Sequence, residues 1–210
     1  MVHASFVSRD LDVQCRCGEV RGRARGVSPT SVNRALCYCD DCQAFLHHLG
    51  SADLLDAHGG TDVVQLAPSM LSFDRGTERI AGIRLTDKGL YRWFATCCQT
   101  PLGNTAPGVP FVGMHRRSFP NDADVQLGPP RAAILGKFAI GRNPGSGILA
   151  TGQMLAHVAR LLIEWKLRGQ GWPHPFFERD SGLARYPVTT LTTSEREALR
   201  PRCGPRPTAS

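Results

Sequence analysis

The chain has 210 residues, which suits one globular domain with an added lobe, and its hydrophobic content of 41% is enough to build a core. The formal charge of +7 comes almost entirely from arginine and allows two interpretations: an acidic partner, such as nucleic acid or an anionic small molecule, or a bias in composition. Because the arginines are spread along the whole chain without interleaved aromatic residues, we favour the bias and do not expect nucleic acid as a partner. No stretch is apolar enough to span a membrane and residues 1–12 lack a signal region, so we expect a cytoplasmic location.

The first 140 residues show short β-strand patterns separated by turns. Apolar and polar residues alternate around a turn at Gly18, and Asp87, Lys88 and Gly89 supply the turn of a hairpin. Five prolines between 103 and 130 predict a loop-rich segment there. The expected strands are 11–27, 63–66, 70–73, 80–85, 90–96 and 134–140, with one or two helical turns over 42–49.

One long amphipathic helix is expected over 146–168. Ser146 can cap its start, and Gly169 and Gly171 can end it. Its apolar positions are Ile148, Leu155, Val158, Leu161, Leu162 and Trp165, and the face predicted to pack on the β domain is Leu155, Val158, Leu162 and Trp165.

The chain is therefore expected to be mainly β over 11–140, with a helical extension over 141–200 packed on that domain and a disordered tail over 201–210. Within the extension, Thr193, Ser194 and Glu197 indicate the capped start of a second helix.

Seven of the eight cysteines fall into three tight groups: 15/17, 37/39/42 and 97/98. In a reducing compartment they are not expected to form disulfides. Thiolates two or three residues apart can converge on one ion, and zinc is the ion expected for tetrahedral thiolate sites, with iron–sulfur clusters as the main rival. The competing interpretation is that these are ordinary buried cysteines, but the clustering is too dense to favour it.

The number of ligands decides what such a site can do. A zinc ion held by four cysteines is closed and only stabilises the fold, whereas three protein ligands leave a position for water or substrate. The middle group supplies three thiolates and no obvious fourth ligand. His47 and His48 follow closely and could complete the site, relay protons or simply face solvent.

Taken together, three cysteine motifs resemble those of the glutathione-dependent formaldehyde-activating enzymes, a family related to centromere protein V with an Mss4-like β-tent fold. The resemblance covers roughly residues 11–140 and identifies the chain as a divergent member. The motifs are Cys15-Arg16-Cys17-Gly18-Glu19-Val20, Cys37-Tyr38-Cys39-Asp40-Asp41-Cys42-Gln43 and Phe94-Ala95-Thr96-Cys97-Cys98-Gln99-Thr100-Pro101-Leu102.

The resemblance implies two zinc sites. Carried over, Cys15, Cys17 and Cys98 are structural ligands, while the open site linked to catalysis consists of Cys37, Cys39 and Cys42.

The third motif departs from the family pattern, because Ala95 stands in place of a cysteine and Gln99 in place of a glycine. Either the additional Cys97 replaces the missing ligand or the structural site is incomplete. Because adjacent residues of a strand point to opposite faces, binding of one ion by both Cys97 and Cys98 requires a turn or bulge.

Two functions follow from this resemblance and from the residues. The first is a carbon–sulfur lyase that acts on adducts of a small thiol such as glutathione, with S-hydroxymethylglutathione as the type of substrate and Arg16, Arg34 and Arg92 as candidate partners of its carboxylates. The second is a non-catalytic zinc module for protein or nucleic-acid interaction, which the lost cysteine and the basic charge favour.

Overall fold

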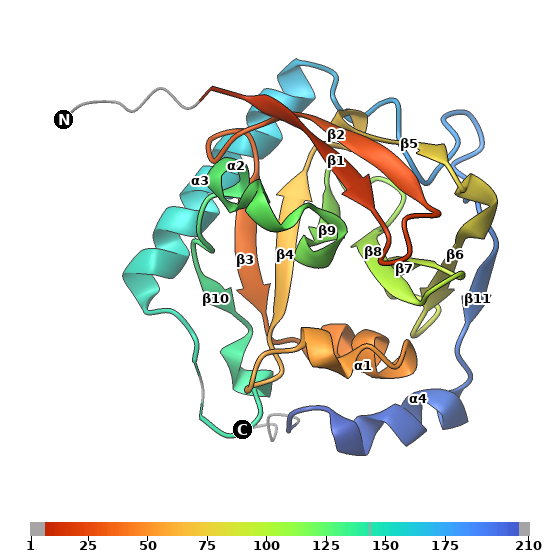
Figure 1. The fold of residues 1–210 in the computed structure, drawn as a ribbon. Helices are drawn as coiled ribbons and strands as arrows, with labels where there is room; N and C mark the ends of the chain where they lie inside the picture. The colour runs from red at the N-terminus through yellow and green to blue at the C-terminus, as the bar shows by residue number, and fades with distance from the viewer. Residues whose placement is uncertain (1–6, 143, 206–210) are drawn as a thin grey trace.

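The computed structural model describes residues 7–142 and 144–205, and these form two β-sheets with four α-helices around them (Figure 1). The expectation of a mainly β protein is therefore confirmed. The helices are α1 (Asp40–His48), α2 (Asp124–Leu127), α3 (Ile148–Leu167) and α4 (Thr193–Leu199). None of the helices in the described part of the chain is both long and apolar enough to cross a membrane.

The smaller sheet has the order β1-β2-β5 and the larger one the order β10-β3-β4-β9-β8-β7-β6-β11. Neighbours are antiparallel except for the pairs β10/β3 and β11/β6, which add a parallel strand at each edge of the larger sheet. The strands are β1 (Arg9–Gln14), β2 (Arg21–Val27), β3 (Asn33–Cys37), β4 (Thr61–Leu66), β5 (Leu71–Arg75), β6 (Ile80–Arg84), β7 (Tyr91–Ala95), β8 (Thr100–Thr105), β9 (Val112–His115), β10 (Ala133–Ile134) and β11 (Val188–Thr190).

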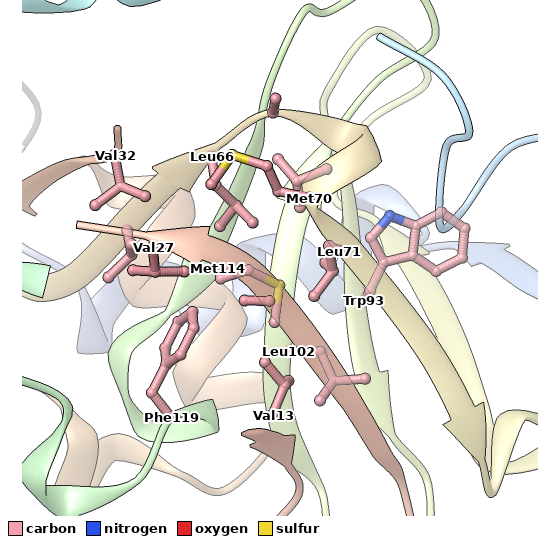
Figure 2. Packing of buried hydrophobic residues seen from close by; sticks show 14 of the residues in the cluster. Val13, Val27, Val32, Leu66, Met70, Leu71, Trp93, Leu102, Met114 and Phe119 are labelled. Carbon is pink, nitrogen blue, oxygen red and sulfur yellow. The ribbon is translucent and has the colours of Figure 1, made fainter. Parts of the chain in front are cut away.

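The main core lies between the two sheets. Side chains alternate between the faces of a strand, and the pairing of Val64 with Met114 puts both on the face that the smaller sheet covers. Figure 2 shows Met114 packed among Val13 and Val27 of the smaller sheet and Leu102 of the larger one. This apolar burial fixes the register of both sheets, because a shift by one residue would turn these side chains outward.

The opposite face of the larger sheet carries α1. Phe45 and Leu46 of this helix pack on Ile83 of β6, and Leu199 of α4 joins the same cluster from outside. The helix thus covers a face that the register fills with Cys37, Thr61 and His115 instead of with apolar residues alone.

The packing of α3 differs from the prediction. The buried positions of this helix are Met154, Leu161 and Trp165, with Val158 and Leu162 partly buried beside them. Leu155 was predicted to face the β domain but is 57% exposed, since it lies about 100° around the helix from Met154.

Ser146 does not cap α3, whose N-cap is Gly147. The Ser146 hydroxyl instead accepts a hydrogen bond from the amide of Ala133. The capped start of α4 was predicted at Thr193, Ser194 and Glu197, one or two positions too late, because the capping box consists of Thr192 and Glu195.

Further differences from the sequence-based expectations concern short strands. The segment predicted as loop-rich contains β9. Its four residues lie between Pro110 and Pro120 and include no proline, so their amide groups can pair with the neighbouring strands. Of the strand predicted over 134–140 only Ile134 is in a strand, as the last residue of β10, since Leu135 adopts a left-handed conformation with φ 57°. The edge strand β11 was missed.

The tail also differs from its predicted disorder. Residues 200–202 form a 3-10 helix, and the buried Gly204 donates its amide hydrogen to Gln43 Oε1 at 2.8 Å. Residues 206–210, which the same prediction covers, lie outside the described part of the chain.

The two faces of α3 can be compared by one matched pair of substitutions. Leu161→Ala should lower the free energy of unfolding by about 2–5 kcal/mol, because its side chain is 1% exposed in the main core. Leu155→Ala, the same change on the exposed face, should cost less than about 0.5 kcal/mol. Urea titration of both variants measures the difference, and equal losses would contradict the packing of this helix.

Candidate metal centres

Four thiols from two turns that are distant in sequence converge at one point. Cys15 and Cys17 lie in the turn between β1 and β2, and Cys97 and Cys98 lie in the turn between β7 and β8. Their sulfur atoms all lie within 4.8 Å of one another. The distances from Cys97 Sγ are 3.8 Å to Cys15 Sγ, 3.4 Å to Cys17 Sγ and 3.8 Å to Cys98 Sγ.

These spacings suit a single tetrahedral ion. With four Zn–S bonds of about 2.3 Å, the sulfur–sulfur edge of the tetrahedron is about 3.8 Å. A disulfide requires about 2.05 Å, and the eight cysteines are free thiols. In an iron–sulfur cluster the cysteines bind different iron atoms, so their sulfur atoms lie further apart than around a single ion.

The turn after β7 explains how two adjacent cysteines reach the same point. Strand geometry ends at Ala95, and residues 96–99 form a turn in which Gln99 has φ 55°. Cys97 and Cys98 therefore escape the alternation of a strand. Ala95, which stands where the resembled family has a cysteine, is fully buried in the main core.

Polar hydrogens surround the sulfur atoms of this four-thiol group. The amide of Val20 donates to Cys15 Sγ at 3.3 Å, and the hydroxyl of Thr100 lies 3.1 Å from Cys98 Sγ. Burial opposes ionisation of Cys98, but the hydrogen bonds from Thr100 and from the Cys17 backbone outweigh it and lower the pKa of this thiol to about 6. The thiolate, the form that binds metals, is thus favoured at Cys98, whereas burial raises the pKa of Cys15 and of Cys97.

The second group consists of Cys37, Cys39 and Cys42, whose sulfur atoms also lie within 4.8 Å of one another. Cys37 ends β3, Cys39 is the N-cap of α1 and Cys42 lies in its first turn. The amide of Cys42 donates to Cys39 Sγ at 3.3 Å, and Cys42 Sγ is 3.9 Å from Cys37 Sγ. The start of the helix thus presents its positive end to this group.

Arg92 is a buried cation beside this three-thiol group. Its Nη1 donates to Cys42 Sγ at 3.6 Å, and its Nη2 lies 3.6 Å from a carboxylate oxygen of Asp41. Hydrogen bonds from Cys37 and Cys39, followed by the charge of Arg92, lower the pKa of Cys42 well below its usual value despite burial. The pKa of Cys37 and of Cys39 is raised, so Cys42 is the thiol of this group that ionises first. If all three thiols ionised on binding a divalent cation, their charges and that of Arg92 would sum to zero, which would lower the cost of burying the group.

Neither His47 nor His48 belongs to a ligand group among the described residues, so the structure does not supply the fourth ligand that the sequence suggested. Burial and the charge of Arg202 lower the pKa of His47.

Of the three candidate arginines, Arg34 is already paired, because its guanidinium binds Asp62 at 2.7 Å and Asp124 at 2.9 Å. Arg16 donates a hydrogen bond to the carbonyl oxygen of Cys98. Together with Arg117 it lines an open pocket of about 140 Å³.

Sequence reasoning missed a small cavity under α1. Cys42 and Arg92 line it together with Thr61, Asn104 and His115, which come from β4, β8 and β9. No local sequence motif predicts that these three residues belong to a site. Only the pairing of the strands brings them beside Cys42.

A family model described as "Family of unknown function (DUF6151)" matches residues 7–186. The crystal structure of a Rhodobacter sphaeroides protein from a structural genomics programme is similar, with 16% identity and a TM-score of 0.41 over 57% of this chain and 97% of that chain. No significant match is found among curated proteins.

The two groups predict two metal ions per chain. Elemental analysis of the purified protein should find about two zinc ions per chain, and Cys203→Ser, which changes the cysteine outside both groups, should keep both. Chelation should release the metal and lower the melting temperature, because metal binding contributes to folding. An unchanged melting temperature with no metal released would contradict this prediction.

Arg92 should affect only the three-thiol group. Arg92→Met removes the charge beside Cys42 and should weaken zinc binding there by about 10–100-fold, as expected for a group that contacts a ligand. Arg79→Met, which removes an exposed cation paired with Glu19, is the matched control. Competition with a chromogenic chelator resolves the two zinc affinities, and a loss at the four-thiol group instead would refute the assignment.

Proposed function

The chain belongs to the DUF6151 family, whose description assigns no function, and we propose that it is a zinc protein with one structural site and one open site. The four-thiol group of Cys15, Cys17, Cys97 and Cys98 is the structural site, since a complete tetrahedron leaves no position for a substrate. The three-thiol group is the open site. Its free thiols suit a reducing compartment such as the cytoplasm.

For the open site we favour carbon–sulfur lyase chemistry on adducts of a small thiol such as glutathione, on a fold like the Mss4-like β-tent. The observation that carries this proposal is a group of three thiols with a ligand position left over and a buried cation at 3.6 Å from one sulfur. A bound zinc ion would stabilise the substrate sulfur as a thiolate. In the cleavage direction the hydroxyl group of the adduct gives its proton to water, the carbon–oxygen bond becomes a carbonyl and the carbon–sulfur bond breaks. The bonding electron pair stays on sulfur, which leaves as thiolate, and the other product is an aldehyde.

The pocket that contains Arg16 and Arg117 suits the rest of such a substrate. Its volume is about 140 Å³, and it shares Pro101 with the cavity beside Cys42. Guanidinium groups bind carboxylates in bidentate geometry, and glutathione carries two of them. Arg34, by contrast, is not proposed to bind a substrate carboxylate, because its guanidinium is already paired with Asp62 and Asp124.

A non-catalytic zinc module is the second candidate. The observation that favours it is the exposed apolar face of α3, which includes Ile148, Leu155, Ile163 and Leu167. Exposed apolar patches mark sites of protein interaction. On this alternative both zinc ions serve only to hold the fold.

Two serine variants separate the structural site from the open one. Cys39→Ser should lose one zinc ion and any turnover of S-hydroxymethylglutathione but keep much of the fold, because serine is itself a good N-cap for α1. Cys17→Ser should lose the other ion and lower the melting temperature by roughly 5–10 °C more, since this group joins turns 80 residues apart.

Metal content, thermal melting and turnover are measured for both variants and for the wild type. Equal losses of stability would contradict the division between the two sites. Absence of turnover by the zinc-loaded wild type would favour the non-catalytic module.

A further inference from the structure

The cavity beside Cys42 is built from one face of the larger sheet. Val63 of β4 pairs with His115 of β9, and Thr61 of β4 pairs with Cys37 of β3. Because paired residues share a face and Thr61 and Val63 are two positions apart, all four side chains point to the side that α1 covers. The pairing of Arg92 with Asn104 extends this face to β7 and β8.

His115 offers a buried donor without a partner. Its side chain is 6% exposed, and Nδ1 accepts a hydrogen bond from the amide of Arg117 at 3.1 Å, so the ring proton lies on Nε2. Nε2 has no hydrogen-bond partner among the described residues. Burial lowers the pKa of His115 to about 4, which keeps the ring neutral near pH 7.

Thr61 repeats this pattern on the neighbouring strand. It is 5% exposed, and its hydroxyl also finds no partner within the described part of the chain. Buried polar groups are nearly always hydrogen-bonded, so two unpaired donors that line one cavity indicate a missing acceptor.

The size of the cavity limits what this acceptor can be. Its volume is about 20 Å³, enough for one group of the size of a water molecule. Arg92 adds a fixed positive charge to the lining, which favours an oxygen atom that carries partial negative charge.

We propose that this cavity is a subsite for a single oxygen atom, held by His115 Nε2–H and the Thr61 hydroxyl. It takes the hydroxyl oxygen of the thiol adduct when substrate is bound and a water molecule when it is not. The substrate part rests on the proposed function. In an S-hydroxymethyl adduct the oxygen is two bonds from the sulfur, which matches an oxygen subsite that shares Cys42 with the open thiol group.

The test compares two ligands that differ at one atom. S-Hydroxymethylglutathione, studied in equilibrium mixtures of glutathione and formaldehyde with glutathione alone as the blank, carries the hydroxyl group. S-Ethylglutathione has a methyl group in its place. The zinc-loaded wild type should bind the hydroxymethyl adduct at least about tenfold more tightly, since a site built for a hydroxyl group rejects the analogue without it.

Matched variants assign the preference to the two donors. Thr61→Val and His115→Met should abolish it, because they remove the donor that the hydroxymethyl adduct pairs with and that S-ethylglutathione leaves unpaired. His115→Gln should retain most of the preference, because the glutamine amide nitrogen can replace Nε2–H. Zinc content and melting temperature are measured for each variant to show that the fold persists. Equal affinities of the wild type for both ligands, or a preference that survives both Thr61→Val and His115→Met, would overturn the proposal.

Failure of the proposed function has a different signature. If the wild type binds neither ligand, the lyase proposal fails, and the oxygen subsite is decided by crystallography at atomic resolution. A single ordered water within hydrogen-bonding distance of His115 Nε2 and Thr61 Oγ1, absent from His115→Met, would support the subsite. A dry cavity would refute it.

Discussion

The convergence of four sulfur atoms from two turns is the constraint on which the rest of the structure depends. Cys15 and Cys17 belong to the smaller sheet, and Cys97 and Cys98 to the larger one, so a shared ion would join the two layers at their rim. Without a metal, thiolates 3.4–3.8 Å apart repel one another. The apolar core between the sheets supplies the bulk of the stability, while this site fixes how their ends meet.

The two faces of the larger sheet differ in polarity. One face is apolar and packs on the smaller sheet, which fixes the register of the strands that contribute to this core. That register places thiol, hydroxyl, imidazole and guanidinium groups on the opposite face, where α1 covers them. The polar face is therefore a consequence of the packing of the apolar one, and burial under α1 gives its charges and hydrogen bonds their strength.

Arg92 illustrates how the two thiol groups differ. In the four-thiol group Cys17 is exposed and solvent screens its charge, although Cys15 is buried. In the three-thiol group Cys37 and Cys42 are buried and Cys39 is partly exposed, and the buried guanidinium of Arg92 beside Cys42 supplies a balancing charge. The two groups thus differ in the number of thiols, and the three-thiol group has a buried cation in contact with one of its sulfur atoms.

The sequence by itself determined the mainly β class, the three cysteine groups 15/17, 37/39/42 and 97/98, and the long helix-forming stripe, because alternation, cysteine spacing and helical periodicity are local properties. It could not decide whether Cys97 and Cys98 act together, since that depends on the turn at Gln99. Only the tertiary structure excluded His47 from the thiol group and turned Leu155 outward. It alone brought Thr61 and His115 to Cys42, because strand pairing joins residues whose positions along the chain carry no trace of their contact.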